Sequence, residues 1–351
     1  MGLHVGPAIA CDAVRGQWPA SRCLALKPKC VVGLGLPSDL IHSLEDRYEV
    51  MAWSETQPMP ESILQEWLVD ARGLLCALST PITASLIKQA QQLSVISTIS
   101  VGVDHIDLTA ASRAGIPVGH TPGVLVDSTA DLTLGLMLAV TRRMAEADRW
   151  MRGGHWARGW QSDLLLGTDL SKATVGIVGL GPIGEAVVRR LRGFGCRVLA
   201  WNRTAKEIEG AQLVGLNEVF EQSDIVSLHT ALTDDTTHIA SAARLASMRP
   251  GATLINTGRG LLVDEAALIR ELSAGRLMAG LDVFTEEPLP ANHPLLALDN
   301  VVLLPHVGSA TTATRLAMVD RAMSNLHAGM TGERLPYCAN PDVYAESPSR
   351  L

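Results

Sequence analysis

The stretch from Thr174 to Glu185 restricts the possible folds of this chain more than any other segment. It reads Thr-Val-Gly-Ile-Val-Gly-Leu-Gly-Pro-Ile-Gly-Glu, so an apolar, β-branched run ends in glycines at 179, 181 and 184. A helical pattern follows directly over residues 186–192. A buried strand, a tight glycine turn and a helix in immediate succession are typical of the first unit of a doubly wound α/β sheet.

Each glycine of this turn meets a separate steric requirement. Gly179 permits the sharp turn, Gly181 lets the backbone approach a ligand, and Gly184 lets the helix lie close to the strand. Pro182 and Ile183 open the helix, whose first N–H groups and positive dipole end favour phosphate. We therefore interpret the turn as a pyrophosphate site for a dinucleotide. A plain strand-to-helix connection is the alternative.

Length and charge narrow the class of partner. At 351 residues the chain can form two domains of ordinary size. The formal net charge of -7 argues against nucleic acid and against an anionic membrane surface, because both favour a basic face. No apolar run reaches the ~18 residues of a membrane span. We therefore expect a small-molecule ligand, no nucleic acid and no membrane.

The cysteines and the N-terminal residues bear on compartment and processing. The six cysteines are scattered without metal-ligand spacing, so we expect reduced thiols, no metal site and a cytoplasmic protein. Residues 1–28 lack the apolar core of a secretory signal and are interpreted as a flexible N-terminal extension. A weak transit-like segment is the alternative.

Strand and helix patterns alternate along the chain. Strands are predicted at 30–36, 74–78 and 95–99 and, after the glycine turn, at 197–202, 224–228, 252–256, 279–284 and 301–305. A helix that is apolar on nearly all sides at first is expected from Ser128 to about Met151, buried between domains or subunits. The alternation predicts an α/β fold with two Rossmann-like domains, each built on a doubly wound parallel sheet.

A final helix pattern over residues 312–327 is long enough to return to the first domain. The substrate domain is therefore expected to be discontinuous, with residues 29–125 and 311–340. Residues 126–310 form the predicted dinucleotide-binding domain, and 341–351 a C-terminal tail. The cleft between the two domains is the expected place of the chemistry.

Three ionisable side chains follow late strands of the dinucleotide-binding domain. Arg259 lies in Asn-Thr-Gly-Arg-Gly, Glu287 in Glu-Glu-Pro, and His306 in Pro-His-Val-Gly-Ser. Reduction of a 2-oxo acid needs a cation for the carboxylate and a proton donor for the developing alkoxide. Arginine offers a bidentate cation, and histidine a proton near neutral pH. Taken singly, each residue also has a structural interpretation, as a turn cation, a surface acid or a strand-end histidine.

In order and spacing, the glycine turn and these three segments resemble the D-isomer-specific 2-hydroxyacid dehydrogenase family. The resemblance extends from about Val31 to Asn340 and implies an NAD(P)-dependent enzyme with Arg259, Glu287 and His306 as its catalytic residues. It also implies that Asp282 binds the nicotinamide carboxamide. The expected contacts are Val101, Gly102, Arg259 and Ser309 for the substrate, and Gly179, Gly181, Pro182, Ile183, Gly184, Asn202, Arg203, Thr204, Thr257, Asp282 and Gly308 for the cofactor.

The end of the second strand of the dinucleotide-binding domain bears on cofactor choice. NAD enzymes keep an acidic residue there for the ribose 2′-hydroxyl, whereas this chain has Asn202, Arg203 and Thr204. Arg203 can bind the 2′-phosphate that a carboxylate would repel. NADP(H) is therefore expected over NAD(H), with a basic exposed turn as the alternative.

Within the family, residues 121–125, 288–295 and the tryptophan-bearing loop 153–160 most resemble the glyoxylate/hydroxypyruvate reductases. That resemblance implies a homodimer in which Trp156 or Trp160 reaches the neighbouring active site. It also implies a small 2-oxo acid substrate, reduced from glyoxylate to glycolate or from hydroxypyruvate to D-glycerate.

Other functions on the same fold remain open at this point. One is reduction of 2-ketogluconate or another 2-oxo acid, including 3-phosphoglycerate chemistry. The lack of a basic cluster near Val101 argues against a phosphorylated substrate. Another is a non-catalytic NAD(P)-sensing binding protein, against which the complete Arg, Glu and His set argues.

Three positions depart from the family pattern: Pro182 replaces a frequent Arg, His120 an Asn and Asp131 a Glu.

Overall fold

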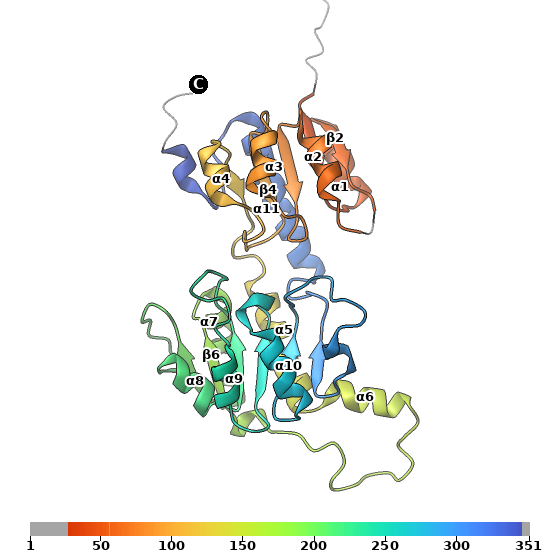
Figure 1. Cartoon of the computed structure of the whole chain (residues 1–351), viewed down its shortest axis with the longest axis vertical. Helices are drawn as coiled ribbons and strands as arrows, with labels where there is room; N and C mark the ends of the chain where they lie inside the picture. The colour runs from red at the N-terminus through yellow and green to blue at the C-terminus, as the bar shows by residue number, and fades with distance from the viewer. Residues whose placement is uncertain (1–26, 56, 346–351) are drawn as a thin grey trace, which may run out of the picture.

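The computed structural model describes residues 27–55 and 57–345, which form two α/β lobes stacked along the long axis of the molecule (Figure 1). Apart from Lys27 and Pro28, the predicted N-terminal extension lies outside the described residues. Of the predicted C-terminal tail, residues 341–344 form a 3₁₀ turn in which Val343 is buried.

The first lobe contains a five-stranded, all-parallel sheet in the order β2-β1-β3-β4-β5. Its strands are β1 (Lys29–Val32), β2 (Glu49–Ala52), β3 (Gly73–Cys76), β4 (Val95–Thr98) and β5 (Val118–Gly119). Its helices are α1 (Ser38–Glu45), α2 (Glu61–Leu68), α3 (Ala84–Gln89), α4 (Leu108–Arg113) and α11 (Thr312–Thr331). Helices α2, α3 and α4 pack on one face, and α1 and α11 on the other.

Helix α11 crosses back from the end of the chain onto the first sheet, as predicted. The Thr311 side chain caps its first turn, and Gly332, with φ +80°, ends it. The Ser97 hydroxyl donates to the Ala322 carbonyl at 2.8 Å. A Cβ on Gly329 would lie only 2.4 Å from Val95 Cβ, so the helix lies directly on β4. The first lobe is therefore discontinuous in sequence.

The second lobe contains a seven-stranded parallel sheet in the order β12-β11-β10-β9-β6-β7-β8. Its strands are β6 (Thr174–Val178), β7 (Arg197–Trp201), β8 (Gln212–Leu213), β9 (Ile225–Leu228), β10 (Thr253–Asn256), β11 (Met278–Leu281) and β12 (Val301–Leu303). Its helices are α5 (Val126–Thr141), α6 (Met144–Arg152), α7 (Pro182–Leu191), α8 (Leu216–Gln222), α9 (Ala242–Ser247) and α10 (Glu265–Ser273). The predicted fold class is confirmed. The strand order reverses between β6 and β9, where such sheets bind ligands.

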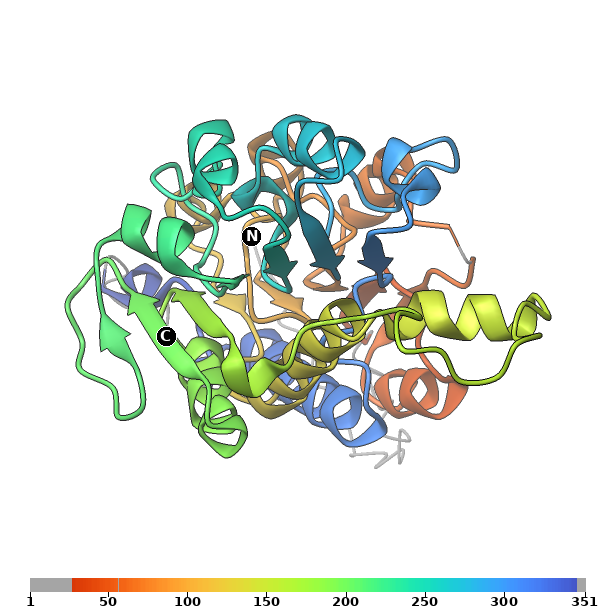
Figure 2. The same cartoon turned by 90° about the horizontal axis from the view of Figure 1, so that it is seen from below.

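The single helix predicted from Ser128 to about Met151 is wrong, because the chain breaks after α5. Arg143 adopts a left-handed conformation with φ +50°. The carbonyl of Thr141 accepts from the Thr168 amide at 2.9 Å instead of continuing the helix. Helix α6 buries none of its residues and, with the loop that follows, projects away from both sheets (Figure 2).

Strands β2, β5 and β8 were not predicted. Strands β5 and β8 are two residues long, and the side chains of β8 are exposed. A strand this short has no measurable alternation in sequence. The predicted strands include β3 and β9, in which all four residues are buried and most are apolar.

Candidate active site

The glycine turn after β6 has the tight geometry expected from its sequence. Gly179 has φ +102°, and a Cβ there would lie 2.8 Å from the backbone of His229. A Cβ on Gly184 would lie 2.0 Å from the Gly179 carbonyl oxygen, so α7 presses on the turn. At Gly181 no atom lies within 4 Å of the Cβ position. The turn therefore leaves open space beside Gly181, where a ligand can approach the backbone.

The first turn of α7 can hold an anion. Pro182 occupies its first position, and no side chain caps it. Within the described residues, the amides of Ile183 and Gly184 have no hydrogen-bond acceptor. Free amides at a helix N-terminus, beside an open backbone, fit the pyrophosphate of a dinucleotide.

The residues after β7 divide into one that is held and two that face outward. Asn202 accepts from the Leu180 amide at 3.0 Å and donates to the Thr204 carbonyl at 2.7 Å, so its side chain joins this turn to the glycine turn. The Arg203 side chain is 73% exposed and lies 4.0 Å from Asp235. Arg203 is therefore free to contact a ligand phosphate at this edge.

A buried carboxylate organises the loop after β12. Asp282 is 1% exposed and accepts from the amides of Val307 at 2.7 Å and Gly308 at 2.8 Å. Burial raises its pKa, although the two amides oppose that effect. The His306 amide donates to the Asp282 carbonyl at 2.9 Å, and His306 itself has φ +54°. These contacts fix the backbone that carries the histidine.

His306 and Glu287 form the closest pair of ionisable groups predicted from the sequence. His306 Nδ1 donates to Glu287 Oε2 at 2.7 Å, and the Phe284 amide donates to Oε1 at 2.9 Å. Burial acts to raise the pKa of Glu287, but His306, the Phe284 amide and the charge of Arg259 together lower it. The pair uses Nδ1, which leaves Nε2 of His306 for another group.

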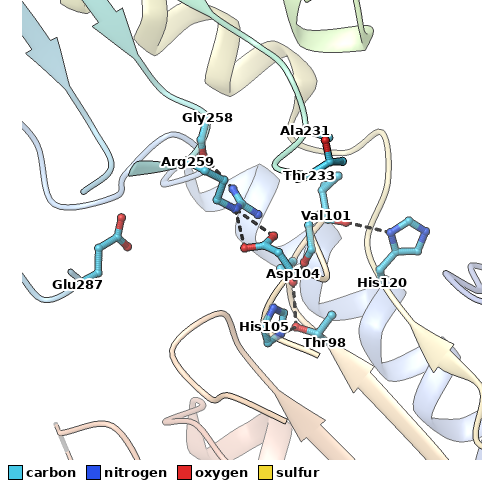
Figure 3. A network of polar contacts seen from close by, with 12 residues as sticks. Thr98, Val101, Asp104, His105, His120, Ala231, Thr233, Gly258, Arg259 and Glu287 are labelled. Carbon is cyan, nitrogen blue, oxygen red and sulfur yellow. Dashed lines mark hydrogen bonds and ion pairs between the residues drawn. The ribbon is translucent and has the colours of Figure 1, made fainter. Parts of the chain in front are cut away.

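Arg259 lies at the carboxyl end of β10 and reaches the first lobe. Asn256 supports its backbone by donating from Nδ2 to the Arg259 carbonyl at 2.8 Å. The Arg259 Nε donates to both carboxylate oxygens of Asp104, at 3.1 and 3.2 Å. In the view of Figure 3, Arg259 lies between Glu287 and the loop that carries Val101 and Asp104.

The loop after β4 is held through its carbonyl groups. The Ser100 hydroxyl donates to the Gly102 carbonyl at 2.7 Å. His120 Nδ1 donates to the Val101 carbonyl at 3.0 Å (Figure 3). Within the described residues, the amides of Val101 and Gly102 have no acceptor. The loop therefore offers N–H donors beside Arg259, as a carboxylate site requires.

The remaining predicted residues lie close to these groups. Thr257 Oγ1 is 2.9 Å from Thr133 Oγ1 of α5, so its hydroxyl joins α5 to the end of β10. Ser309 follows Gly308 and is 9% exposed. The predicted residues thus gather at the carboxyl ends of β4, β6, β7, β10, β11 and β12.

Three residues near the site were not assigned a role from sequence. Asp104 follows a loop glycine, which is its only sequence signal. His120 is visible only as a departure from the family pattern. His229 is half-buried behind the glycine turn, and desolvation lowers its pKa to about 4, so it is neutral near pH 7. Within the described residues, no cluster of metal-ligating side chains occurs, and no helix has the length and apolarity to cross a membrane.

Known sequences match this chain over most of its length. A family model described as "D-isomer specific 2-hydroxyacid dehydrogenase, NAD binding domain" matches residues 134–308. A glyoxylate reductase of Korarchaeum cryptofilum is 39% identical over 328 residues, which cover 92% of this chain and 99% of the relative. A glyoxylate reductase of Thermococcus litoralis is 40% identical over 331 residues, 92% of this chain and 100% of the relative.

Solved structures match equally broadly. A Thermus thermophilus protein has a TM-score of 0.83 at 43% identity, covering 89% of this chain and 99% of that one. An NADPH-dependent glyoxylate/hydroxypyruvate reductase of Sinorhizobium meliloti, in complex with NADP and malonate, has a TM-score of 0.80 at 32% identity, covering 90% and 98%. This chain therefore belongs to the D-isomer specific 2-hydroxyacid dehydrogenases, a family of nicotinamide-dependent oxidoreductases.

Proposed function

We propose that this chain is an NADPH-dependent reductase of small 2-oxo acids, which converts glyoxylate to glycolate and hydroxypyruvate to D-glycerate. The main support is the hydrogen-bonded His306–Glu287 pair at the same sheet edge as Arg259. A proton donor and a carboxylate-binding cation on neighbouring strands are what reduction of a 2-oxo acid requires.

In the proposed reaction, different residues bind the substrate carboxylate, donate the proton and orient the proton donor. Arg259, with the amides of Val101 and Gly102, binds the substrate carboxylate and places the carbonyl carbon. The bound nicotinamide supplies the hydride. His306 Nε2 gives a proton to the carbonyl oxygen as negative charge develops on it, and Glu287 keeps the imidazole ring oriented through Nδ1. Asp282 is proposed to accept from the nicotinamide carboxamide.

Cofactor preference rests on Arg203. Its exposed guanidinium, next to Thr204 at the end of β7, is suited to a 2′-phosphate. Asn202 contributes through the shape of the turn, since its amide group is already bonded to the glycine turn and to Thr204. These features support NADP(H) over NAD(H).

The names of the relatives support a two- or three-carbon substrate. The glyoxylate reductases of two archaea and the bacterial glyoxylate/hydroxypyruvate reductase each align with nearly the whole chain. A larger 2-oxo acid such as 2-ketogluconate is the main alternative on the same machinery. A non-catalytic NAD(P) sensor is disfavoured by the His306–Glu287 hydrogen bond, which a purely binding protein does not need.

We further propose that the protein is a homodimer, in which a second copy of the chain covers helix α6 and the loop that follows it. Trp156 is 53% exposed and Trp160 85% exposed, and both line a cavity of about 290 Å³ with Trp150 and Met151. Exposed aromatic and apolar groups on a projecting arm favour an interface. The scattered cysteines support a cytoplasmic location, which stays a prediction.

The test is a matrix of cofactors and acids followed at the nicotinamide absorbance band. Purified protein receives NADPH or NADH with glyoxylate, hydroxypyruvate or 2-ketogluconate. Fast oxidation of NADPH by either small acid is expected. Preference for NADH would refute the role of Arg203 alone. Preference for 2-ketogluconate would refute the substrate class, and cofactor binding without turnover of any acid would favour the sensor.

A further inference from the structure

Two of the three nitrogens of the Arg259 guanidinium have hydrogen-bond acceptors in the part of the chain that the structure describes, and the third has none. A guanidinium has five N–H donors in a fixed plane. The Nε donor binds the two carboxylate oxygens of Asp104, and Nη1 donates to the Gly258 carbonyl at 2.9 Å. Within the described residues, Nη2 has no hydrogen-bond acceptor. The guanidinium is therefore held through Nε and Nη1, and Nη2 stays free.

The free Nη2 group lies against the loop after β4. A Cβ on Gly102 would lie 1.9 Å from Arg259 Nη2 and 2.8 Å from Asp104 Oδ1, so any larger residue there would displace these side chains. The carbonyls of Val101 and Gly102 are already bonded to His120 and Ser100. The unpaired donors of the guanidinium and of the loop amides thus gather in one place.

The anchoring pair joins the two lobes. Asp104 belongs to the first lobe and Arg259 to the second, and their side chains are 33% and 24% exposed. A pair with this little exposure is screened less by solvent than a fully exposed one. The orientation of Arg259 therefore depends on the distance between the two lobes, because Asp104 can hold it only when the lobes are close together.

We propose that Asp104 is a positioning residue for carboxylate binding, which anchors Nε of Arg259 so that Nη2 stays beside Gly102 and can donate to the substrate carboxylate. This role presupposes the proposed function, because it gives that site its means of orienting the acid. The substrate class follows from the same geometry: an acid whose carboxylate accepts from Nη2 and from the loop amides.

Asp104 has two opposing effects on an anionic ligand. Its negative charge reduces the attraction of Arg259 for a second carboxylate, and its hydrogen bonds remove the rotational freedom of a long side chain. Asp104 takes the single N–H of Nε and leaves both N–H groups of Nη2 for the acid. Bidentate recognition depends on the orientation of the guanidinium plane, so we expect anchoring to outweigh repulsion.

The experiment compares Asp104→Asn and Asp104→Ala with the wild type in turnover of glyoxylate and in calorimetric binding of oxalate, a carboxylate that is not reduced. Both measurements are made with NADPH present. Asp104→Ala should raise KM and the oxalate Kd about 10-fold to 100-fold. Asp104→Asn keeps an acceptor for Nε and should raise them less, with kcat less affected than KM.

Two further variants distinguish positioning from general damage. Glu271→Gln breaks a pair of similar exposure, Glu271 with Arg276 at 2.5 Å, near the C-terminal end of α10, and should leave KM and Kd unchanged. Arg259→Ala should weaken oxalate binding at least as much as Asp104→Ala does. In that background, adding Asp104→Ala should not weaken oxalate binding any further.

The outcomes separate this proposal from the proposed function. Tighter oxalate binding in Asp104→Asn would mean that Asp104 mainly neutralises Arg259, and would overturn the positioning role. Additive effects of Asp104→Ala and Arg259→Ala would overturn it too, as would a wild-type protein that does not bind oxalate. Oxalate binding that follows the expected order without turnover would refute only the proposed reductase.

Discussion

The first strand of each lobe is a largely buried parallel strand that leads into a Gly-Leu-Gly turn. In the first lobe, a Cβ on Gly33 would make ordinary contacts at 3.7 Å or more, and one on Gly35 would contact nothing. In the second lobe, Gly179 has φ +102° and Gly184 lies against its carbonyl oxygen. The difference lies in the third glycine, which brings a helix N-terminus onto the turn, whereas α1 begins only after Pro37.

The same division extends to the charged groups of the site. The second lobe carries Arg259, Glu287, His306 and Asp282 at the ends of neighbouring strands. The first lobe presents backbone amides and one carboxylate, Asp104, which contacts Arg259. We infer that the second lobe holds the cofactor and the ionisable chemistry, and that the first lobe shapes the site for the acid.

The largest expected effect is on turnover. If the second lobe carries the proton donor, His306→Asn should lower kcat by about 10²-fold to 10⁴-fold and leave NADPH affinity unchanged. Steady-state kinetics and a fluorescence titration measure the two quantities. His293→Asn is the matched control, because His293 also pairs with a carboxylate of that lobe, Glu265 at 3.3 Å. Unchanged turnover in His306→Asn would remove it from the chemistry.

The glycine turns give the second prediction. Gly184→Ala places a Cβ 2.0 Å from a backbone oxygen, so α7 must shift and its first amides leave the phosphates. We expect NADPH affinity to fall about 10-fold to 100-fold, equivalent to one hydrogen bond to a charged group. Gly35→Ala meets open space and should change neither affinity nor stability. Equal losses in the two variants would contradict the distinction between the turns.

The sequence predicted those features of the fold that depend on local chemistry. The glycine turn, the buried strands and the returning helix α11 all follow from spacing and hydrophobic pattern. The break at Arg143 does not, because Arg142 and Arg143 are ordinary helix formers and the break depends on Thr168 reaching the Thr141 carbonyl. A contact between segments distant in the chain leaves no signal in either segment.

The site residues that belong to motifs were also predictable from the sequence, whereas contacts between distant segments were not. His306 and Glu287 were named from motifs, and their hydrogen bond confirms that the fold brings them together. The partner of Arg259 was not predictable, because Asp104 lies 155 residues away on another sheet. The hydrogen bond from the Leu180 amide to Asn202 was not predictable either, because it joins two separate turns.

Cofactor preference is a smaller effect confined to one exposed side chain of the second lobe. Arg203→Ser should weaken NADPH binding about 5-fold, because a solvated contact to phosphate contributes roughly 1 kcal/mol, and should leave NADH affinity unchanged. Arg197→Ser, at the opposite end of β7, is the control. Titration of each variant with both cofactors measures the ratio. A loss shared equally by NADPH and NADH would show that Arg203 supports the turn rather than the 2′-phosphate.

The smallest expected effect is on the pH dependence of the free energy of unfolding, which should differ between Glu287 and Asp282 of the second lobe. The folded protein lowers the pKa of Glu287 from its ordinary 4.5, so its ionised form stabilises the fold above that pH, and this contribution is lost as pH falls through the folded-state pKa. Glu287 is 35% exposed, so solvent screening limits the contribution to under about 1 kcal/mol. Burial raises the pKa of Asp282, which gives the opposite slope: stability from that group decreases as pH rises. Chemical denaturation of Glu287→Gln and Asp282→Asn from about pH 7 downward should therefore give differences from the wild type that change in opposite directions, and parallel changes would place both carboxylates in the same electrostatic environment.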